Sequence, residues 1–487
     1  MDPTQFLLNH LPSTPTFESQ VKTLIEASKA NIARIESQIR DLERLRDRER
    51  GLIARLRMAI APIHKLPAEL LVEIFVLVQN HSTISMQYRK QRIRKLHALS
   101  QVCAYWRRVA HTTPQLWTGA LGIELDKTPT ADYVAGVKGW LERSAPLPIP
   151  VSLKARKGVE AGPLMDVMAT TAHRWSNANF NLPSLAVLSR ISSASLESLE
   201  RITLESADAK NHAQTRPFLT AKRLCWVFLD TQRTTQVLMP WAQLTFIHVN
   251  DLSPLECLNT LVQCASVVSA VIETHTWPGF PDMSARQLTT LERLEDLNIS
   301  FGSTSAGFIA PFFVCLALPA LKRLRLELNI DHIWSSAEFT QFQLRSSNIE
   351  DLTIDTAFAL SSGDLLAVLQ HAPSLVELNL ENCMACFDDS VVVGLQYSDM
   401  ETIHLAPKLQ VLGLTYAGTD FDEDALDTMI QSRWWTDEQL FALPSPPKVA
   451  RWSLICIHCG DEEDNVSPQL KAKLEEYKSQ GLDIEVY

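Results

Sequence analysis

The sequence predicts an α/β protein in which a helical N-terminal part precedes a repeat solenoid with a curved parallel sheet. Three observations favour this class: apolar residues in heptads up to residue 63, two short apolar helices within residues 62–120, and a repeated leucine spacing over residues 171–460. A chain of 487 residues exceeds what one core usually supports, and a solenoid avoids that limit because each repeat packs only on its neighbours. We predict a flexible N-terminus (1–16), a coiled-coil helix (17–61), a two-helix module (62–120), a connecting helix and first strand (121–170), the solenoid (171–460) and a C-terminal cap (461–487).

Composition indicates a globular protein of a reducing compartment. Apolar residues make up 46% and charged residues 21% of the chain, and the nine cysteines form no dense framework. We therefore expect free thiols and a cytoplasmic or nuclear location. Residues 1–120 carry 18 Lys and Arg against 10 Asp and Glu, whereas the remainder carries 27 against 46. The acidic remainder argues against nucleic-acid binding, and no apolar run reaches the roughly 20 residues of a membrane helix.

The first helical segment shows a coiled-coil pattern. Apolar residues recur at spacings of three and four, with Ile25, Ile32, Ile39, Ile53 and Ile60 at one heptad position and Val21, Ile35, Leu42, Leu56 and Ile63 at the other. Isoleucine at the first position favours a parallel dimer, because β-branched side chains pack well at that site of a two-stranded seam. Arg46 and Glu49 interrupt the seam. The alternative is a single amphipathic helix that folds back on its own chain.

The next module contains two short helices with wide apolar faces. Pro67 suits the first turn of a helix in which Leu70, Leu71, Ile74, Phe75 and Val78 recur at helical spacing. A second apolar stripe comprises Leu96, Leu99, Val102, Cys103, Trp106 and Val109. Two such helices bury too little surface to be stable alone, so part of it should pack against a partner or the next domain.

At these residues the sequence resembles an F-box. The motif's pieces stand in order as Leu66-Pro67, Glu69-Leu70-Leu71 with Ile74-Phe75, Val102-Cys103 with Trp106-Arg107, and Pro114 with Leu116-Trp117. The layout, with a coiled coil before the module and repeats after it, is similar to the expanded F-box family of mushroom-forming fungi. The family's connection between the two helices is usually shorter than the basic insert from Asn80 to Lys95. This insert is a solvated loop, a nuclear-import signal or a patch for an acidic partner.

The resemblance implies binding to the Skp-type adaptor of a cullin-RING ubiquitin ligase. The residues that would form or support that contact are Leu66, Pro67, Leu70, Leu71, Ile74, Phe75, Val102, Cys103 and Trp106. For Leu66, Pro67 and Phe75 we favour direct contact with the adaptor. For Leu99 and Trp106 we favour packing inside the module.

From residue 175 onward the chain is periodic. The spacing L-x-x-L-x-L, with apolar substitutions, occurs eleven times, with middle members Ala178, Ile202, Val227, Ile247, Ala270, Leu297, Leu324, Leu352, Leu378, Leu412 and Trp452. Most copies lie 20 to 28 residues apart, which is the period of leucine-rich repeats, and the last two steps of 34 and 40 residues indicate insertions. Each repeat should therefore add one strand to a parallel sheet, with helices such as 255–265 and 425–432 on the outer side.

Residues between the buried positions of these strands should face the concave side and form a candidate target-binding surface. Early repeats offer aromatic residues and later ones mostly carboxylates: Trp226, Phe228, Phe246, His248, Asp296, Asn298, Arg323, Arg325, Glu327, Asp351, Asp355, Glu377, Asn379 and Glu381. Exposed aromatic residues commonly anchor interfaces, and an acidic strip suits a basic partner. A solvated polar face with no ligand is the alternative.

The sequence offers no enzyme chemistry. Two C-x-x-C pairs, Cys383/Cys386 and Cys456/Cys459, stand too far apart for a compact zinc ribbon. Cys383 instead occupies the position where the repeat takes Asn or Cys for a buried turn. We find no phosphate-binding loop, dinucleotide fingerprint, H-E-x-x-H motif or nucleophile elbow, and expect no metal or cofactor. The two function classes left are a ligase substrate receptor and a coiled-coil scaffold for protein–protein interaction.

Overall fold

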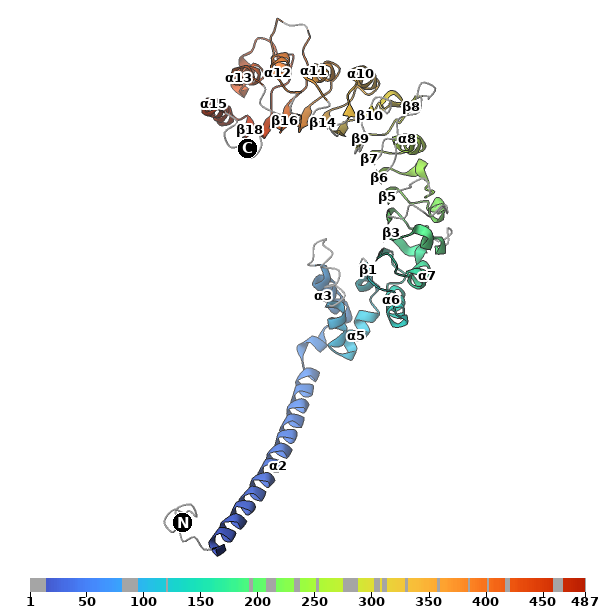
Figure 1. Ribbon diagram of the computed structural model, residues 1–487, viewed down its shortest axis with the longest axis vertical. Helices are drawn as coiled ribbons and strands as arrows, with labels where there is room; N and C mark the ends of the chain where they lie inside the picture. Colours follow the sequence, from blue (N-terminus) through green and yellow to red (C-terminus); the bar gives the residue numbers. More distant parts are fainter. Residues whose placement is uncertain are drawn as a thin grey trace. The chain divides into compact units, whose positions relative to one another are not determined.

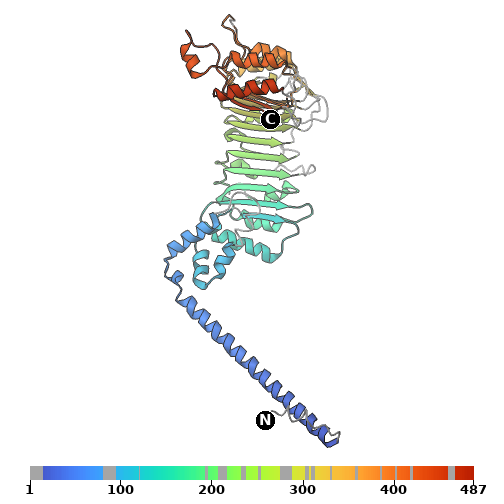
Figure 2. The ribbon, with the colours of Figure 1, turned by 90° about the vertical axis from the view of Figure 1, so that its left-hand side faces the viewer.

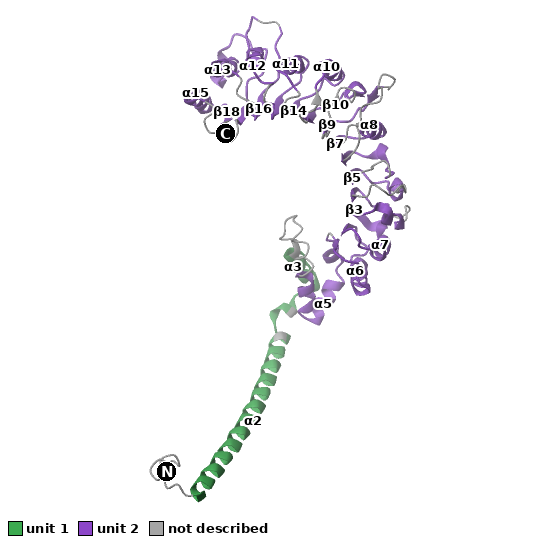
Figure 3. Ribbon diagram, in the orientation of Figure 1, with its two compact units in different colours: residues 1–81 green, residues 82–487 purple. Residues whose placement is uncertain are grey.

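The computed structural model describes most of the chain. The described residues are 15–80, 95–119, 121–191, 196–206, 216–231, 237–250, 254–274, 288–301, 307–308, 313–328, 332–356, 360–383, 386–400, 403–416, 421–458 and 467–486. They fall into two compact units, Met1–His81 and Ser82–Tyr487 (Figure 3). Most of the predicted flexible segment 1–16 and of the basic insert 80–95 lies outside the described residues.

The first unit is helical. The long helix α2 (Pro15–Ala59) ends just before Pro62, which opens the short 3-10 turn η1 (Pro62–Lys65). Proline is tolerated there because the first N–H groups of a helix have no intrahelical acceptor. Helix α3 (Ala68–Asn80) follows, and its first turn includes a backbone hydrogen bond of 3.2 Å from Leu71 to the Pro67 carbonyl. The apolar seam predicted on α2 is exposed, with Ile25, Ile32 and Ile39 all close to half accessible.

The second unit begins with residues 95–101 in a helix, α5 (Ala104–His111) and the 3-10 turn η2 (Pro114–Trp117). Cys103 caps α5, because its sulfur accepts a hydrogen bond of 3.4 Å from the Trp106 N–H. Trp117 is buried: its indole N–H donates to the Ala110 carbonyl at 2.7 Å, and its ring lies 4.8 Å from that of Trp140. Since Trp140 belongs to α6 (Ala131–Arg143), Trp117 contacts both α5 and the first helix of the solenoid.

One parallel sheet runs through the solenoid, with its strands in chain order and helices on the outer side of the curve (Figures 1 and 2). Fourteen strands of the described chain form it: β1 (Leu121–Leu125), β2 (Ile149–Ala155), β3 (Trp175–Asn181), β4 (Arg201–Ser206), β5 (Trp226–Thr231), β6 (Phe246–Asn250), β7 (Ser269–Thr274), β9 (Asp296–Phe301), β12 (Arg323–Leu328), β14 (Asp351–Thr356), β15 (Glu377–Glu381), β16 (Val411–Thr415), β17 (Leu454–His458) and β18 (Asp483–Val486). The structure confirms the predicted α/β class.

The connections between strands carry the remaining elements. Besides α6, the helices are α7 (Gly162–Ala169), α8 (Pro254–Gln263), α10 (Ser336–Arg345), α11 (Ser362–Gln370), α12 (Asp389–Leu395), α13 (Glu423–Ser432), α14 (Asp437–Ala442) and α15 (Pro468–Ser479). Several early repeats use 3-10 turns instead: η3 (Ala172–Arg174), η4 (Leu185–Arg190), η6 (Pro217–Thr220) and η8 (Trp241–Gln243). The connections also contain two short parallel strand pairs: β8 (Thr289–Thr290) with β11 (Leu316–Ala317), and β10 (Gly307–Phe308) with β13 (His332–Ile333). Both 3-10 turns and α-helices can connect strands of one continuous sheet, because these elements lie on its outer side and leave the pairing of the strands unchanged.

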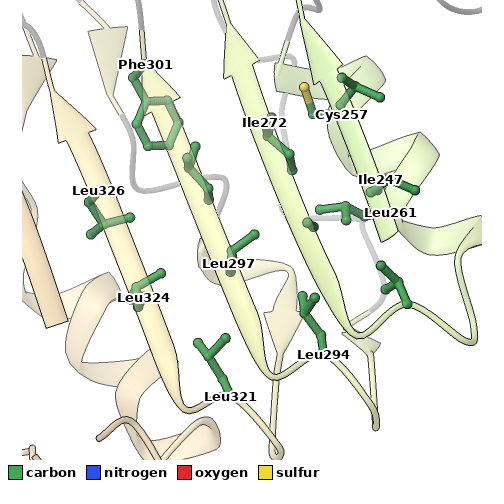
Figure 4. Close-up of a cluster of buried hydrophobic side chains, with 14 of the residues drawn as sticks. Ile247, Cys257, Leu261, Ile272, Leu294, Leu297, Phe301, Leu321, Leu324 and Leu326 are labelled. Atoms are coloured by element: carbon green, nitrogen blue, oxygen red, sulfur yellow. The ribbon is translucent and has the colours of Figure 1, made fainter. Parts of the chain in front are cut away.

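The core is a ladder of aliphatic side chains between the sheet and the outer elements. Leu297 on β9 stands beside Ala270 on β7 and Leu324 on β12, while Leu294 and Leu321 fill the turns before their strands (Figure 4). All five are buried. Each buried leucine contributes about 1.5–3 kcal/mol, and that gain is available only next to a neighbouring repeat.

The sheet extends beyond the predicted solenoid at both ends. Strands β1 and β2 lie before residue 171, and β18, which pairs with β17, lies after residue 460. Within the predicted C-terminal cap, Ile484 pairs with Ile455 and adds one more strand to the sheet. The first strand predicted within residues 121–170 is β2, whereas β1 and β18 were not predicted as strands, because a terminal repeat shows only part of the leucine spacing.

The last repeat predicted from the leucine spacing is corrected in its register. The spacing Val449/Trp452/Leu454 was expected, whereas Leu412 and Leu414 stand beside Ile455 and Ile457. Leu454 therefore lies on the concave side, and the true spacing is Trp452/Ile455/Ile457. Apolar residues stand at both odd and even positions of this stretch, so the sequence allows either set to face the core. Pairing with β16 selects one set, and a shift of one residue would turn every side chain to the other face.

Candidate protein-binding surfaces

Helix α3 presents two distinct apolar stripes. Leu70, Ile74 and Leu77, spaced four and three residues apart, are exposed, with 51% of Leu70 and 56% of Leu77 accessible. Leu71 and Phe75 occupy the adjacent stripe and are fully buried. Large apolar residues at helical spacing that remain exposed on a short helix are typical of a surface that binds another protein.

This burial corrects one expected contact. The sequence analysis favoured direct contact with a partner for Leu66, Pro67 and Phe75. Leu66 is half-buried and Pro67 exposed, but Phe75 has no accessible surface. Phe75 and Leu71 can only support the exposed stripe from within, because the helical turn points residues four apart to the same side.

The segment after the basic insert contributes less exposed apolar surface, and it forms two short helices, residues 95–101 and α5, where the sequence predicts one. Val102 is 49% exposed, whereas Cys103 and Trp106 are half-buried, as is Leu99. Arg107 is tied back to the preceding helix by a bond of 3.0 Å from its Nε to the Ser100 carbonyl. Val102, which lies between these two helices, is thus the apolar residue of this segment best placed to contact a partner.

The concave face of the sheet carries the predicted target-binding residues. They occupy alternate positions on β5 to β15, between the buried residues; Arg323 is exposed and the others are half-buried. Strand pairing sets them in rows across the sheet: Trp226 stands beside Phe246, Phe228 beside His248, and Asp351 beside Glu377. The side chains of each row are therefore near neighbours, although they lie about 20 or more residues apart in the chain.

An aromatic cluster occupies β5 and β6. The rings of Trp226 and Phe246 stack with centroids 5.0 Å apart and an interplanar angle of 3°. Two residues further along the strands, the ring centroids of Phe228 and His248 lie 4.4 Å apart. The Nε2 atom of His248 is 3.0 Å from Oε1 of Glu273 on β7. Sequence reasoning missed Glu273, although it stands at the third outward position of its strand, two residues beyond Val271. The cluster forms an apolar platform with a carboxylate at its margin.

The predicted acidic strip is a mixed charge network. Arg325 on β12 binds Glu327 through Nε at 2.9 Å and reaches across β14 to both carboxylate oxygens of Glu381, at 3.1 and 2.7 Å. These acceptors raise the pKa of Arg325, with the hydrogen bond to Glu381 as the largest cause. Arg323 likewise binds Asp296 at 3.0 Å. Three of the predicted acidic residues, Asp296, Glu327 and Glu381, are therefore already paired with arginines.

Three carboxylates of the strip are left without such a partner. Within the described residues, Asp351, Asp355 and Glu377 form no ion pair with a lysine or arginine. Burial, and then the neighbouring charge of Glu377, raise the pKa of Asp351. A cation that bound between these two carboxylates would relieve that repulsion, so this is where the face is best suited to a basic side chain.

The cysteines of the first pair, Cys383 and Cys386, lie in buried, hydrogen-bonded surroundings. Cys383 is buried, with its sulfur 3.4 Å from the Ile354 carbonyl, and Cys386 donates to the Cys383 carbonyl at 3.4 Å. Its hydrogen bond with Cys383, together with burial, raises the pKa of Cys386. Cys459 of the second pair lies outside the described residues. In the described part of the chain we find no group of three or more His, Cys, Asp or Glu that could hold a metal ion, and no helix there has the length and apolar content to cross a membrane.

Comparison with known proteins identifies the module. Residues 63–120 match the family model described as F-box-like, so the chain carries an F-box-like domain at these residues. Among solved structures, the chain is similar to one in the crystal structure of the Rad7 and Elc1 complex in yeast, with 12% identity and a TM-score of 0.36 over 90% of this chain and 97% of that one. Comparison with curated proteins finds no match.

Proposed function

We propose that this protein is the substrate-recognition subunit of an SCF-type (cullin-RING) ubiquitin ligase. In this proposal the F-box-like domain binds a Skp-type adaptor and the concave face of the solenoid binds a protein target. The observation that carries it is the match of residues 63–120 to the F-box-like family, together with the exposed stripe Leu70, Ile74 and Leu77 on α3. The proposed role requires no chemistry from the chain itself, since holding target and ligase together raises their effective concentration.

Adaptor binding is the first test. The purified full-length chain should bind a Skp-type adaptor directly, and the variant Leu66→Ala/Pro67→Ala should bind at least tenfold more weakly, because it removes apolar contact and loosens the start of α3. Isothermal titration or a quantitative pull-down would measure this. Absence of any binding by the native chain would reject the ligase role.

A scaffold without a ligase is the alternative function. The observation that favours it is α2, a helix of 45 residues with an exposed apolar seam that an adaptor-binding role does not require. Both functions, scaffold and substrate receptor, predict a protein partner on the concave face. Only binding to the adaptor distinguishes them.

Target binding should depend on the aromatic platform. Replacing both Trp226 and Phe246 by alanine removes the stacked pair, and we expect loss of the main target in affinity capture followed by mass spectrometry. The control is Val268→Ala/Val393→Ala, which removes exposed apolar side chains outside this cluster. If the same targets were recovered with both double variants, the platform would have no part in recognition.

A further inference from the structure

Helix α2 carries an apolar surface that its own unit leaves uncovered. Over 45 residues, roughly 68 Å at 1.5 Å per residue, the seam residues Ile25, Ile32, Ile35 and Leu42 remain 44–66% exposed. Leu24 and Leu45 widen the seam on one side and are also more than half exposed. Such a continuous stripe is stable in water only when another surface covers it.

The residues on the two sides of the seam differ in character. One flank carries Lys22, Lys29, Glu36 and Glu43, with the basic residues first and the acidic residues second. The other flank carries Leu24, Asn31, Gln38 and Leu45, none of which is charged. Within the described residues, Glu36 and Glu43 form no ion pair, while Lys22 and Lys29 are paired only along the helix, with Glu18 and Glu26.

We infer that residues 21–46 of α2 pair in antiparallel orientation with the same segment of a second copy of this chain. One register sets Ile25 opposite Leu42, and Ile32 opposite Ile35, of the second copy. The same register brings Lys29 opposite Glu36 and Lys22 opposite Glu43. On the uncharged flank it brings Leu24 opposite Leu45 and Asn31 opposite Gln38. The register leaves Ile39 opposite Ser28, the one central core layer that is not apolar on both sides, while both flanks agree in charge and polarity, which is what specifies a coiled-coil partner.

Other arrangements lack this complementarity. In a parallel pair the charged flank of one helix faces the uncharged flank of the other, so that Leu24 meets Lys29 and Leu45 meets Arg50 and no opposite charges face each other. An antiparallel pair shifted by one heptad in one direction places Ile25 opposite Glu49 and Lys22 opposite Arg50, and a shift in the other direction places Lys29 opposite Lys29. The isoleucine pattern alone favours a parallel pair, but the flanking charges select the antiparallel one.

The seam interruption fits the same alignment. Arg46 falls opposite Val21, at the end of the paired segment, so neither it nor Glu49 is forced into the core. Arg46 is instead satisfied along its own helix by Asp47 at 3.0 Å. The apolar residues from Leu52 to Ile60 lie beyond the paired segment and take no part in it. The inference is independent of adaptor binding and holds for a receptor or a scaffold alike.

Disulfide cross-linking of the full-length chain tests the orientation. We expect that Ile25→Cys and Leu42→Cys, mixed in equal amounts and oxidised, form a mixed disulfide between residues 25 and 42, and that neither variant alone forms a disulfide dimer. The native chain under the same oxidation controls for its own cysteines. Disulfide dimers in each variant alone would show a parallel pair, and a native chain that sediments as a monomer at high concentration would show no pair; either result overturns the inference.

Charge reversal tests the register. Lys29→Glu or Glu36→Lys alone should weaken dimerisation by roughly tenfold, because two exposed ion pairs per dimer become repulsive, and the double variant should restore it. The matched control is Arg44→Glu, which also removes an ion pair to the residue three positions earlier, Asp41, but on the outer side of the helix. Sedimentation equilibrium should show no weakening for the control. Equal weakening by Lys29→Glu and Arg44→Glu, or no restoration in the double variant, would refute the register.

Discussion

The variant Leu70→Glu/Ile74→Glu is expected to lose adaptor binding by roughly 100-fold or more while remaining folded, because each exposed apolar anchor of an interface contributes about 2 kcal/mol. Both side chains lie on the exposed stripe of α3, where a charge stays in water in the free protein. In the complex the two carboxylates would be buried without partners, which costs more than the lost apolar contact. Titration calorimetry would measure the affinity, and urea unfolding the stability.

Two further variants separate binding from folding. Leu344→Glu makes the same chemical change at an exposed leucine of α10 and should leave adaptor affinity unchanged. Phe75→Ala, in contrast, should lower the free energy of unfolding of the module by about 3–5 kcal/mol, because its ring is fully buried. If the Leu70→Glu/Ile74→Glu variant bound the adaptor like the native chain, the exposed stripe of α3 would not be the adaptor site.

Arg433→Ala should destabilise the C-terminal repeats by about 3–5 kcal/mol, since it removes two side-chain hydrogen bonds to backbone carbonyls and leaves a cavity behind. The Arg433 side chain has no accessible surface, and its two terminal nitrogens donate to the carbonyls of Ala406 and Leu405 at 3.2 and 2.8 Å. Its guanidinium also lies 5.6 Å from the ring centroid of Trp452, which begins the last full repeat. Burial lowers the pKa of Arg433 to about 10, so the side chain is still charged at neutral pH.

The effect should be local, because a solenoid transmits stability mainly between adjacent repeats. Hydrogen exchange should accelerate in β16 and β17 and stay unchanged in β4 to β7. Arg451→Ala is the matched control: this guanidinium also lies 5.6 Å from a tryptophan ring, that of Trp434, but its side chain is 40% exposed and its ion pair is with Asp437 at the surface. We expect a loss below about 1 kcal/mol there. Equal losses for both arginines would contradict a special role of the buried one.

Local patterns were sufficient for the elements whose signal repeats. The strand residues Leu297, Leu324 and Leu352 could be predicted because each copy of the leucine spacing confirms the phase of the others, and parallel pairing then sets them side by side. The connecting helix predicted within residues 121–170 is observed as α6, since its apolar period is not interrupted. The F-box-like module was recognisable because its motif is a set of short ordered pieces that does not depend on distant contacts.

The sequence by itself therefore determined the class of the fold, the repeat and the F-box-like domain. Only the tertiary structure decided which face of α3 is exposed, the phase of β17, and the bridge from Arg325 to Glu381 across an intervening strand. The same holds for Arg433, which is charged and yet fully buried, with its donors bound to two carbonyls 27 and 28 residues earlier in the chain. The physical reason is common to all of these: local periodicity specifies what a segment forms, whereas burial and charge pairing depend on which segments become neighbours.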